Sequence, residues 1–149
     1  MYAADVSDLG TDRAPEDMVA FVRETLALQG AGQFTFVDLR EGAVSGVLLA
    51  SSFFSLKVNG RALWIEALFV KPEYRRRGVA RALVEHLLDW AEGASYQGIE
   101  LESYGMNTAA SILFRDLDFK RLARERYCHY FRQVQFKRAH SGLYPLRRF

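Results

Sequence analysis

The spacing of hydrophobic residues changes once along the first half of the chain. Residues 15–29 place hydrophobic side chains three and four positions apart, which predicts an amphipathic helix, and Pro15 suits its first turn. From Phe34 the spacing falls to two, the period of a half-buried strand. The dipeptide Asn59-Gly60 predicts a tight hairpin. The predicted strands cover residues 34–39, 44–56 and 62–70.

The second half alternates helices with strands. The stripe over Val79–Glu92 is the clearest helical pattern in the chain, with charged side chains on its outer face. A strand is predicted over Gly98–Tyr104, and Asn107 or Thr108 then caps a helix over residues 109–117. Two final strands are predicted over residues 119–122 and 127–132. This order of elements predicts an α+β fold with a mixed, mostly antiparallel sheet flanked by helices.

A basic turn separates the third strand from the clearest helix. Its sequence is Arg75-Arg76-Arg77-Gly78-Val79-Ala80. The first turn of a helix has N–H groups without intrahelical acceptors and a partial positive charge, so it suits a phosphate. Arginine adds positive charge, and a glycine lets the ligand approach closely. Two interpretations stay open from these residues alone: a phosphate-binding site, or a basic turn whose glycine serves only the backbone.

Composition predicts one soluble domain over residues 1–149, with 133–149 as a candidate C-terminal extension. The chain is half hydrophobic and 26% charged, has no apolar run of bilayer length, and begins without the apolar core of a signal peptide. No membrane partner is therefore expected. Cys128 is the only cysteine, which fits a reducing cytoplasm. No metal is expected, because His86 lacks a second ligand one helical turn further on.

Charge is distributed unevenly along the chain. Residues 120–149 contain nine Lys and Arg residues and one acid, a net charge of +8, whereas the whole chain carries +2. The remainder therefore carries −6. A basic end is one mark of nucleic-acid binding, but no base-stacking motif or DNA-reading helix accompanies it. No nucleic-acid partner is predicted.

Two blocks of the sequence resemble the signature of the GNAT superfamily of N-acetyltransferases. WIEALFVKPEYRRRGVARALVEHL resembles its strand, linker and [Gln/Arg]-x-x-Gly-x-[Gly/Ala] turn, with Arg75, Gly78 and Ala80 at the specified positions. Residues 107–119 resemble its Asn-x-x-Ala-x-x-Leu-Tyr-x-x-x-Gly-Phe block. The resemblance covers about residues 34–132. It implies a three-layer fold that binds acetyl-CoA, as co-substrate, where two strands splay apart. Those strands would be Ala62–Val70 and Gly98–Tyr104.

The same resemblance implies which residues would hold acetyl-CoA. Backbone groups of Leu68, Phe69 and Val70 would pair with the pantetheine arm and the thioester carbonyl. Backbone amides from Arg76 to Arg81 would hold the diphosphate, and Asn107 would contact the arm from the far side. The expected donor-binding residues are Leu68, Phe69, Val70, Arg75, Arg76, Arg77, Gly78, Val79, Ala80, Arg81 and Asn107.

The implied reaction is direct attack of an amine on the thioester. It needs a base, because an amine in neutral water is mostly protonated and the ammonium form is not nucleophilic. Glu66 is the candidate, since its strand resembles that of polyamine-type GNAT enzymes and a carboxylate attracts a cationic amine. The family's general-acid tyrosine falls at Phe114, which has no proton to donate. The family's glycine falls at Asp118, which suggests an altered helix end.

Three accounts of Phe114 stay open. Tyr104 is the first candidate for a substitute acid. Alternatively, the CoA thiolate leaves unprotonated, or the domain is an acyl-CoA-binding regulatory module with little turnover. The expected acceptor is a primary amine of a small molecule or peptide: a polyamine-like molecule, an amino sugar, a lysine or a protein N-terminus. A homodimer is expected by analogy with the family, with residues 133–149 as the candidate interface.

Overall fold

A computed structural model describes residues 27, 32–103, 107–123, 127 and 129. The chain divides into two units: Val22–Glu125, and Met1–Phe21 together with Arg126–Phe149. Every described helix and strand belongs to the unit Val22–Glu125. In the other unit only Tyr127 and His129 are described, and neither lies in a helix or strand.

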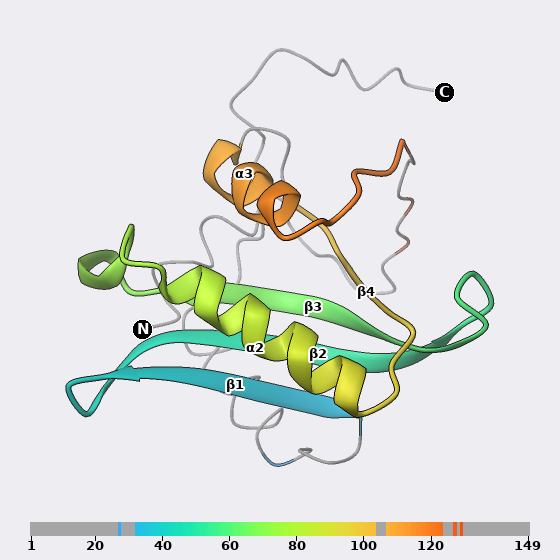
Figure 1. Cartoon of the computed structure of the whole chain (residues 1–149), viewed down its shortest axis with the longest axis horizontal. Helices are drawn as coiled ribbons and strands as arrows, with labels where there is room; N and C mark the ends of the chain where they lie inside the picture. The colour runs from blue at the N-terminus through green and yellow to red at the C-terminus, as the bar shows by residue number, and fades with distance from the viewer. Residues whose placement is uncertain (1–26, 28–31, 104–106, 124–126, 128, 130–149) are drawn as a thin grey trace. The chain divides into compact units, whose positions relative to one another are not determined.

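Among the described residues, the unit Val22–Glu125 contains a four-stranded sheet and the two helices α2 and α3 (Figure 1). The strands stand in the order β1-β2-β3-β4; β1, β2 and β3 pair antiparallel, while β4 pairs parallel to β3. The predicted α+β class and mixed sheet are confirmed. The elements are β1 (Gln33–Arg40), β2 (Ala43–Ser55), β3 (Gly60–Val70), the short 3-10 helix η2 (Pro72–Tyr74), α2 (Val79–Gly93), β4 (Gly98–Leu101) and α3 (Thr108–Asp116).

Most of the predicted elements are confirmed to within a few residues, and two differ. β4 ends at Leu101, before the predicted end at Tyr104. The predicted strand over residues 119–122 is wrong, because this stretch is irregular. Its first residue, Phe119, still belongs to the end of α3, since its N–H donates to the carbonyl of Phe114 at 2.9 Å. The predicted helix over residues 15–29 and strand over 127–132 lie largely outside the described residues; Ala27 is helical.

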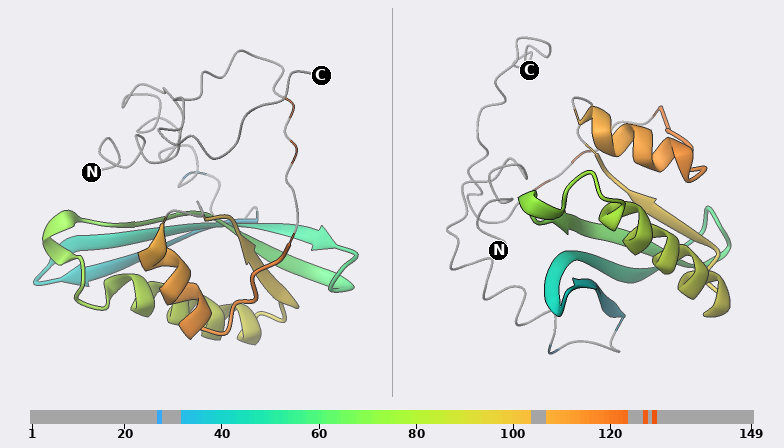
Figure 2. Two further views of the ribbon diagram at one scale, coloured as in Figure 1. Left: turned by 90° about the horizontal axis from the view of Figure 1, so that it is seen from above. Right: turned by 60° about the vertical axis from the view of Figure 1, so that its left-hand side comes forward.

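The core lies between the sheet and α2. Leu48, Ala50, Leu63 and Ile65 from β2 and β3 form one buried cluster with Val79, Leu83, Val84, Leu87 and Ala91 of α2. Phe114 and Leu117 pack against the same cluster, so α3 lies on the same face of the sheet as α2 (Figure 2). The first turn of α2 approaches β2 closely at Gly46. A Cβ atom there would come within 2.7 Å of Val79 Cγ1, so only glycine fits.

The end of α3 explains the aspartate at the family's glycine position. Asp118 adopts φ +62°, and its N–H donates to Arg115 O at 3.1 Å, while Phe119 N–H donates to Phe114 O. This is the left-handed helix ending that glycine supplies most readily. The expectation of an altered helix end is therefore wrong, because the chain keeps the ending and holds an aspartate in the strained conformation.

We expect Asp118→Gly to stabilise the fold. A left-handed conformation costs a residue with a Cβ atom about 1 kcal/mol, and the exposed Asp118 side chain has no described partner whose loss would offset this gain. Urea unfolding of both proteins measures the difference. Asp89→Gly, on the exposed face of α2, is the control and should lose a few tenths of a kcal/mol, because glycine ranks only slightly below aspartate in helix propensity. A less stable Asp118→Gly protein would contradict the assignment of strain.

Candidate active site

The two strands predicted to splay apart do so after a short parallel pairing. β3 and β4 pair from Ala62 with Gly98 to Ile65 with Leu101. β3 then continues to Val70, while the chain beyond β4 turns away toward α3 (Figure 1). The stretch from Glu66 to Val70 therefore has β2 on one side and a free edge, among the described residues, on the other.

Glu66 lies at the point where the strands part, and it lies in a β-bulge. Leu49 pairs with Ala67 and Ala50 pairs with Ile65, so Glu66 is the extra residue of β3. A bulge bends its strand and redirects the side chain it carries. The Glu66 side chain is exposed, and its Oε1 accepts a hydrogen bond from Ser51 Oγ at 2.7 Å.

The ladder between β2 and β3 shows which backbone groups face the free edge. Lys71 N–H donates to Ser45 O at 2.9 Å, which makes this pair hydrogen-bonded. Because hydrogen-bonded pairs alternate along an antiparallel ladder, Phe69 directs its N–H and C=O toward β2. Leu68 and Val70 direct theirs toward the edge. The Val70 carbonyl already accepts from Arg75 Nε at 3.1 Å, which leaves the Val70 N–H and both groups of Leu68.

The basic turn that begins at Arg75, named the arginine turn, leads directly into α2. Gly78 is the N-cap of α2 at φ +79°, no described side chain caps the helix, and no acid lies in its first turn. The N–H groups of Val79, Ala80 and Arg81 therefore have no intrahelical acceptor. A Cβ atom at Gly78 would meet nothing within 4 Å. The glycine is thus required by its backbone angle, and the space beside it is open to a ligand.

The arginines of this region have different partners. Arg75 bonds to the end of β3, and Arg81 Nη2 donates to Asp116 Oδ2 of α3 at 3.2 Å. Arg76 and Arg77 are exposed, and within the described part of the chain neither makes a hydrogen bond or ion pair. Two guanidinium groups beside a positive helix end make a local site for an anion with several negative charges.

Residues 107–119, the second block that resembles the family, contribute the N-cap of α3 and the aromatic ring of Phe114. Asn107 is the N-cap of α3, and its Oδ1 accepts from Ala110 N–H at 3.1 Å, so its side-chain amide nitrogen remains for another partner. Phe114 lies edge-on to Phe119, with ring centroids 5.4 Å apart, and adds no hydroxyl. Tyr104, the predicted substitute acid, lies outside the described residues.

Ser51 is a site residue that the sequence alone does not reveal. It stands opposite Trp64 in the ladder, and only the bulge at Glu66 brings the carboxylate within its reach. A serine in a run of strand residues carries no signal for such a contact.

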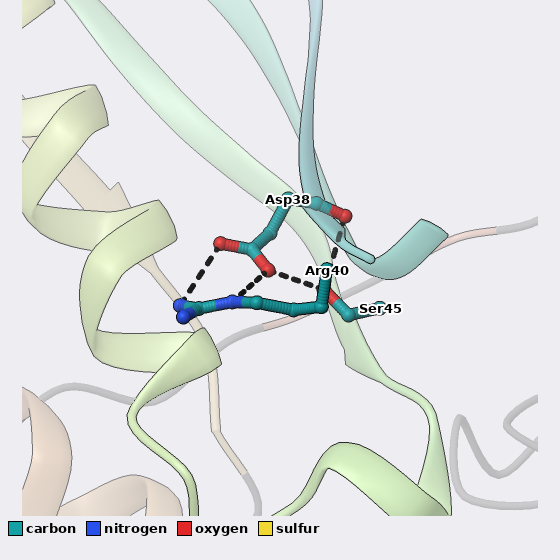
Figure 3. A network of polar contacts seen from close by, with 3 residues as sticks. All are labelled: Asp38, Arg40 and Ser45. Atoms are coloured by element: carbon teal, nitrogen blue, oxygen red, sulfur yellow. Dashed lines mark hydrogen bonds and ion pairs between the residues drawn. The ribbon is translucent and has the colours of Figure 1, made fainter. Parts of the chain in front are cut away.

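A polar network joins the end of β1 to the start of β2 (Figure 3). Arg40 donates to both carboxylate oxygens of Asp38, from Nε at 2.9 Å and from Nη2 at 3.3 Å. The buried Ser45 hydroxyl lies against the same carboxylate and the Asp38 backbone oxygen. The hydrogen bonds from Arg40, then those from Ser45, lower the pKa of Asp38, against a smaller opposing effect of burial. Because Ser45 O also holds Lys71, this network supports the end of β3.

The lowered Asp38 pKa predicts a pH-dependent contribution to stability. A carboxyl whose pKa is lower in the folded state stabilises the fold above its unfolded value of about 3.9, and this contribution is lost as the pH falls through the folded value. We expect wild type to exceed Asp38→Asn in urea midpoint at neutral pH and the gap to close below about pH 4. Asp89→Asn, an exposed carboxyl on α2, should show no such gap. A gap that persists at low pH would contradict the ionic origin.

The described residues contain neither a metal cluster nor a membrane-spanning helix. Among them, no three His, Cys, Asp or Glu side chains gather as they would around a metal ion. No helix in that part of the chain is both long and apolar enough to cross a membrane.

Comparison with known proteins identifies the family. The sequence model of the acetyltransferase (GNAT) family matches residues 4–119, and the chain belongs to this family. It is 27% identical to human N-acetyltransferase 8 over 113 residues, which cover 76% of this chain and 50% of that protein. The [ribosomal protein bS18]-alanine N-acetyltransferase of Escherichia coli K12 is 42% identical over 50 residues, 34% of each protein. The chain spans about half the length of N-acetyltransferase 8 and of mouse N-acetyltransferase 8F1.

Solved structures show the same fold. The crystal structure of a probable acetyltransferase superposes with a TM-score of 0.75 at 17% identity, over 89% of this chain and 88% of that one. The ribosomal-protein-alanine N-acetyltransferase of Brucella melitensis biovar Abortus 2308 gives 0.65 at 20% identity, over 87% and 91%. The aminoglycoside acetyltransferase AAC(6')-Iy, solved with a CoA-containing bisubstrate analogue, gives 0.64 at 22% identity, over 82% of each chain.

Proposed function

We propose that this chain is an acetyl-CoA-dependent N-acetyltransferase that acts on a primary amine. The observation that carries the proposal is the position of Glu66. Its carboxylate lies where β3 and β4 part, on the same strand whose far end leads into the arginine turn. The free edge of β3 thus runs from the Glu66 carboxylate, which can accept a proton, to the turn before the N-terminus of α2, which can bind an anion.

The residues of this edge suit the chemistry of acetyl-CoA. The first-turn amides of α2, with Arg76 and Arg77, would hold the diphosphate. The Val70 N–H and the backbone groups of Leu68 would pair with the amides of the pantetheine arm, as an added strand does at a sheet edge. We assign these edge contacts to Leu68 and Val70, since Phe69 directs its peptide groups toward β2. The structure of AAC(6')-Iy with a CoA-containing analogue supports this donor.

Glu66 would act as the general base. Its carboxylate accepts a proton from the bound ammonium group, directly or through water, and the free amine then attacks the thioester carbonyl carbon. A carbon–nitrogen bond forms, the carbon–sulfur bond breaks and the CoA thiolate departs, while the acylated nitrogen releases its second proton to solvent. Tyr104 is our candidate for returning a proton to that sulfur, and solvent is the alternative. The new amide and the CoA thiol are the products.

The acceptor class follows from charge and from the names of relatives. An exposed carboxylate and the net charge of −6 over residues 1–119 favour a cationic amine. Relatives are named for an alanine of ribosomal protein bS18 and for aminoglycosides, so a peptide amine and an amino sugar both belong among the candidates. We propose a small-molecule or peptide amine and assign no single acceptor.

A second candidate function is a module that binds acyl-CoA and turns it over slowly. Phe114 favours it, because the family's acid position carries a ring packed against Phe119 and the core. The expected homodimer, the expected cytoplasmic location and the single domain over residues 1–149 stay predictions.

Release of CoA thiol tests the proposal. Purified protein is incubated with acetyl-CoA and, in separate reactions, a polyamine, an amino sugar, free lysine and an alanine-terminated peptide. We expect amine-dependent thiol release with at least one of them and an acetylated product of matching mass. Tight CoA binding by calorimetry without transfer to any amine would favour the binding module, and absence of CoA binding would overturn both functions.

A further inference from the structure

We propose that Ser51 is a positioning residue that orients the Glu66 carboxylate for catalysis. This inference rests on the proposed function, since it assigns a partner to the base of that reaction. Ser51 lies on β2, and Glu66 on the neighbouring β3. Their side chains meet at 2.7 Å between Ser51 Oγ and Glu66 Oε1, which is the length of a charge-assisted hydrogen bond.

The bulge explains why a positioning residue is needed. Glu66 is the unpaired extra residue of β3, and its side chain is exposed. An exposed glutamate has three rotatable bonds, and nothing in a regular ladder would fix its carboxylate. Ser51 is half-buried and belongs to the paired, regular part of β2. It therefore provides a fixed donor beside an acceptor that could otherwise rotate.

The chemistry of the hydroxyl limits what Ser51 does. A serine hydroxyl has one proton to donate, and here it points to Oε1. The other carboxylate oxygen, Oε2, remains to accept a proton from the amine or from a bridging water. Ser51 thus selects which oxygen of Glu66 meets the substrate, without contacting the reacting atoms itself.

The residue next to Ser51 offers a matched control. Ser52 lies on the same strand and is also half-buried, and its hydroxyl has no hydrogen-bond partner among the described residues. Because successive strand residues point to opposite faces, its side chain is directed away from Glu66. Ser51→Ala and Ser52→Ala each remove one hydroxyl group from β2. Only Ser51→Ala removes a contact with the Glu66 carboxylate.

The test compares Ser51→Ala, Ser51→Thr and Ser52→Ala in steady-state acetyl transfer to the acceptor found active. We expect Ser51→Ala to lower kcat about tenfold, the scale of a lost hydrogen bond to a charged group, with KM for acetyl-CoA unchanged. Ser51→Thr keeps the hydroxyl and should keep most of kcat, and Ser52→Ala should match wild type. Melting temperatures within a few degrees of wild type show that each variant folds.

A double-mutant cycle separates positioning from simple structural support. In a Glu66→Gln protein the base is already gone, so adding Ser51→Ala should lower kcat no further. A full tenfold loss in that background, or an unchanged kcat in Ser51→Ala alone, would overturn the role of Ser51 and leave the proposed function standing. A wild type without transfer, or a Glu66→Gln protein with full activity, would overturn the proposed mechanism itself and Ser51 with it.

Discussion

Glu66→Gln is expected to lower kcat for acetyl transfer by about a hundredfold or more, which is the scale of general-base catalysis. Glutamine keeps the shape of glutamate and an oxygen for the Ser51 hydroxyl, so the fold and the bulge should persist. The variant loses only the ability to accept the proton of the ammonium group. Initial rates of thiol release at saturating acetyl-CoA and amine measure the effect.

Two controls make the result specific to Glu66. The Kd for CoA should not change, because the donor's anion site lies at the arginine turn and not at the bulge. Glu92→Gln removes an exposed carboxylate at the end of α2 and should keep the wild-type rate. A Glu66→Gln protein as fast as wild type would exclude this carboxylate as the base and return the choice to groups in the rest of the chain.

The position of Glu66 could be predicted in part from sequence. The apolar run over residues 62–70, which follows the Asn59-Gly60 hairpin, places Glu66 within the third strand, and family resemblance gives it a role. The bulge that frees it from the ladder is a shift of one residue between Leu49 and Ala50, and it depends on how two strands pair. No local pattern specifies such a shift, since both strands are largely apolar around it and show no regular alternation.

The features of the arginine turn, like the position of Glu66, could be predicted only in part from the sequence. Three adjacent arginines predict positive charge, and a glycine before a helix predicts an open N-terminus. The sequence does not separate Arg75, which bonds to the Val70 carbonyl, from Arg76 and Arg77, which project outward. The backbone between them is also irregular: Arg76 takes φ +60°, an angle that hydrophobic patterning cannot indicate. The charge of a turn is thus predictable, whereas the direction of each side chain depends on the backbone.

Helix ends mark another limit of prediction. The stripe in Val79–Glu92 predicts α2 almost to the residue, because its buried face is long and regular. The sequence predicts a short strand over residues 119–122, yet Phe119 closes α3 and packs against the core. A few apolar positions fit a helix end as well as a strand, and tertiary contact decides between them.

Gly78→Val is expected to raise the Kd for CoA by about a hundredfold, or about 2.7 kcal/mol. A β-branched residue is an outlier at φ +79°, so valine must either strain the N-cap or turn the backbone away from this angle. In both cases the first-turn amides of α2 lose their common direction. The isopropyl group also enters the open space beside Gly78, where a diphosphate would approach. Calorimetry with CoA measures the change without any need for an acceptor.

Gly93→Val supplies the control at the other end of the same helix. A Cβ atom at Gly93 also meets nothing within 4 Å, but this residue is not in the left-handed region and lies far from the turn. Its Kd for CoA should equal that of wild type. Equal weakening in both variants would point to a general loss of helix stability, whereas unchanged affinity in Gly78→Val would place the diphosphate away from the N-terminus of α2. Weakening in Gly78→Val alone would tie donor binding to the backbone of the turn, since every arginine remains in place.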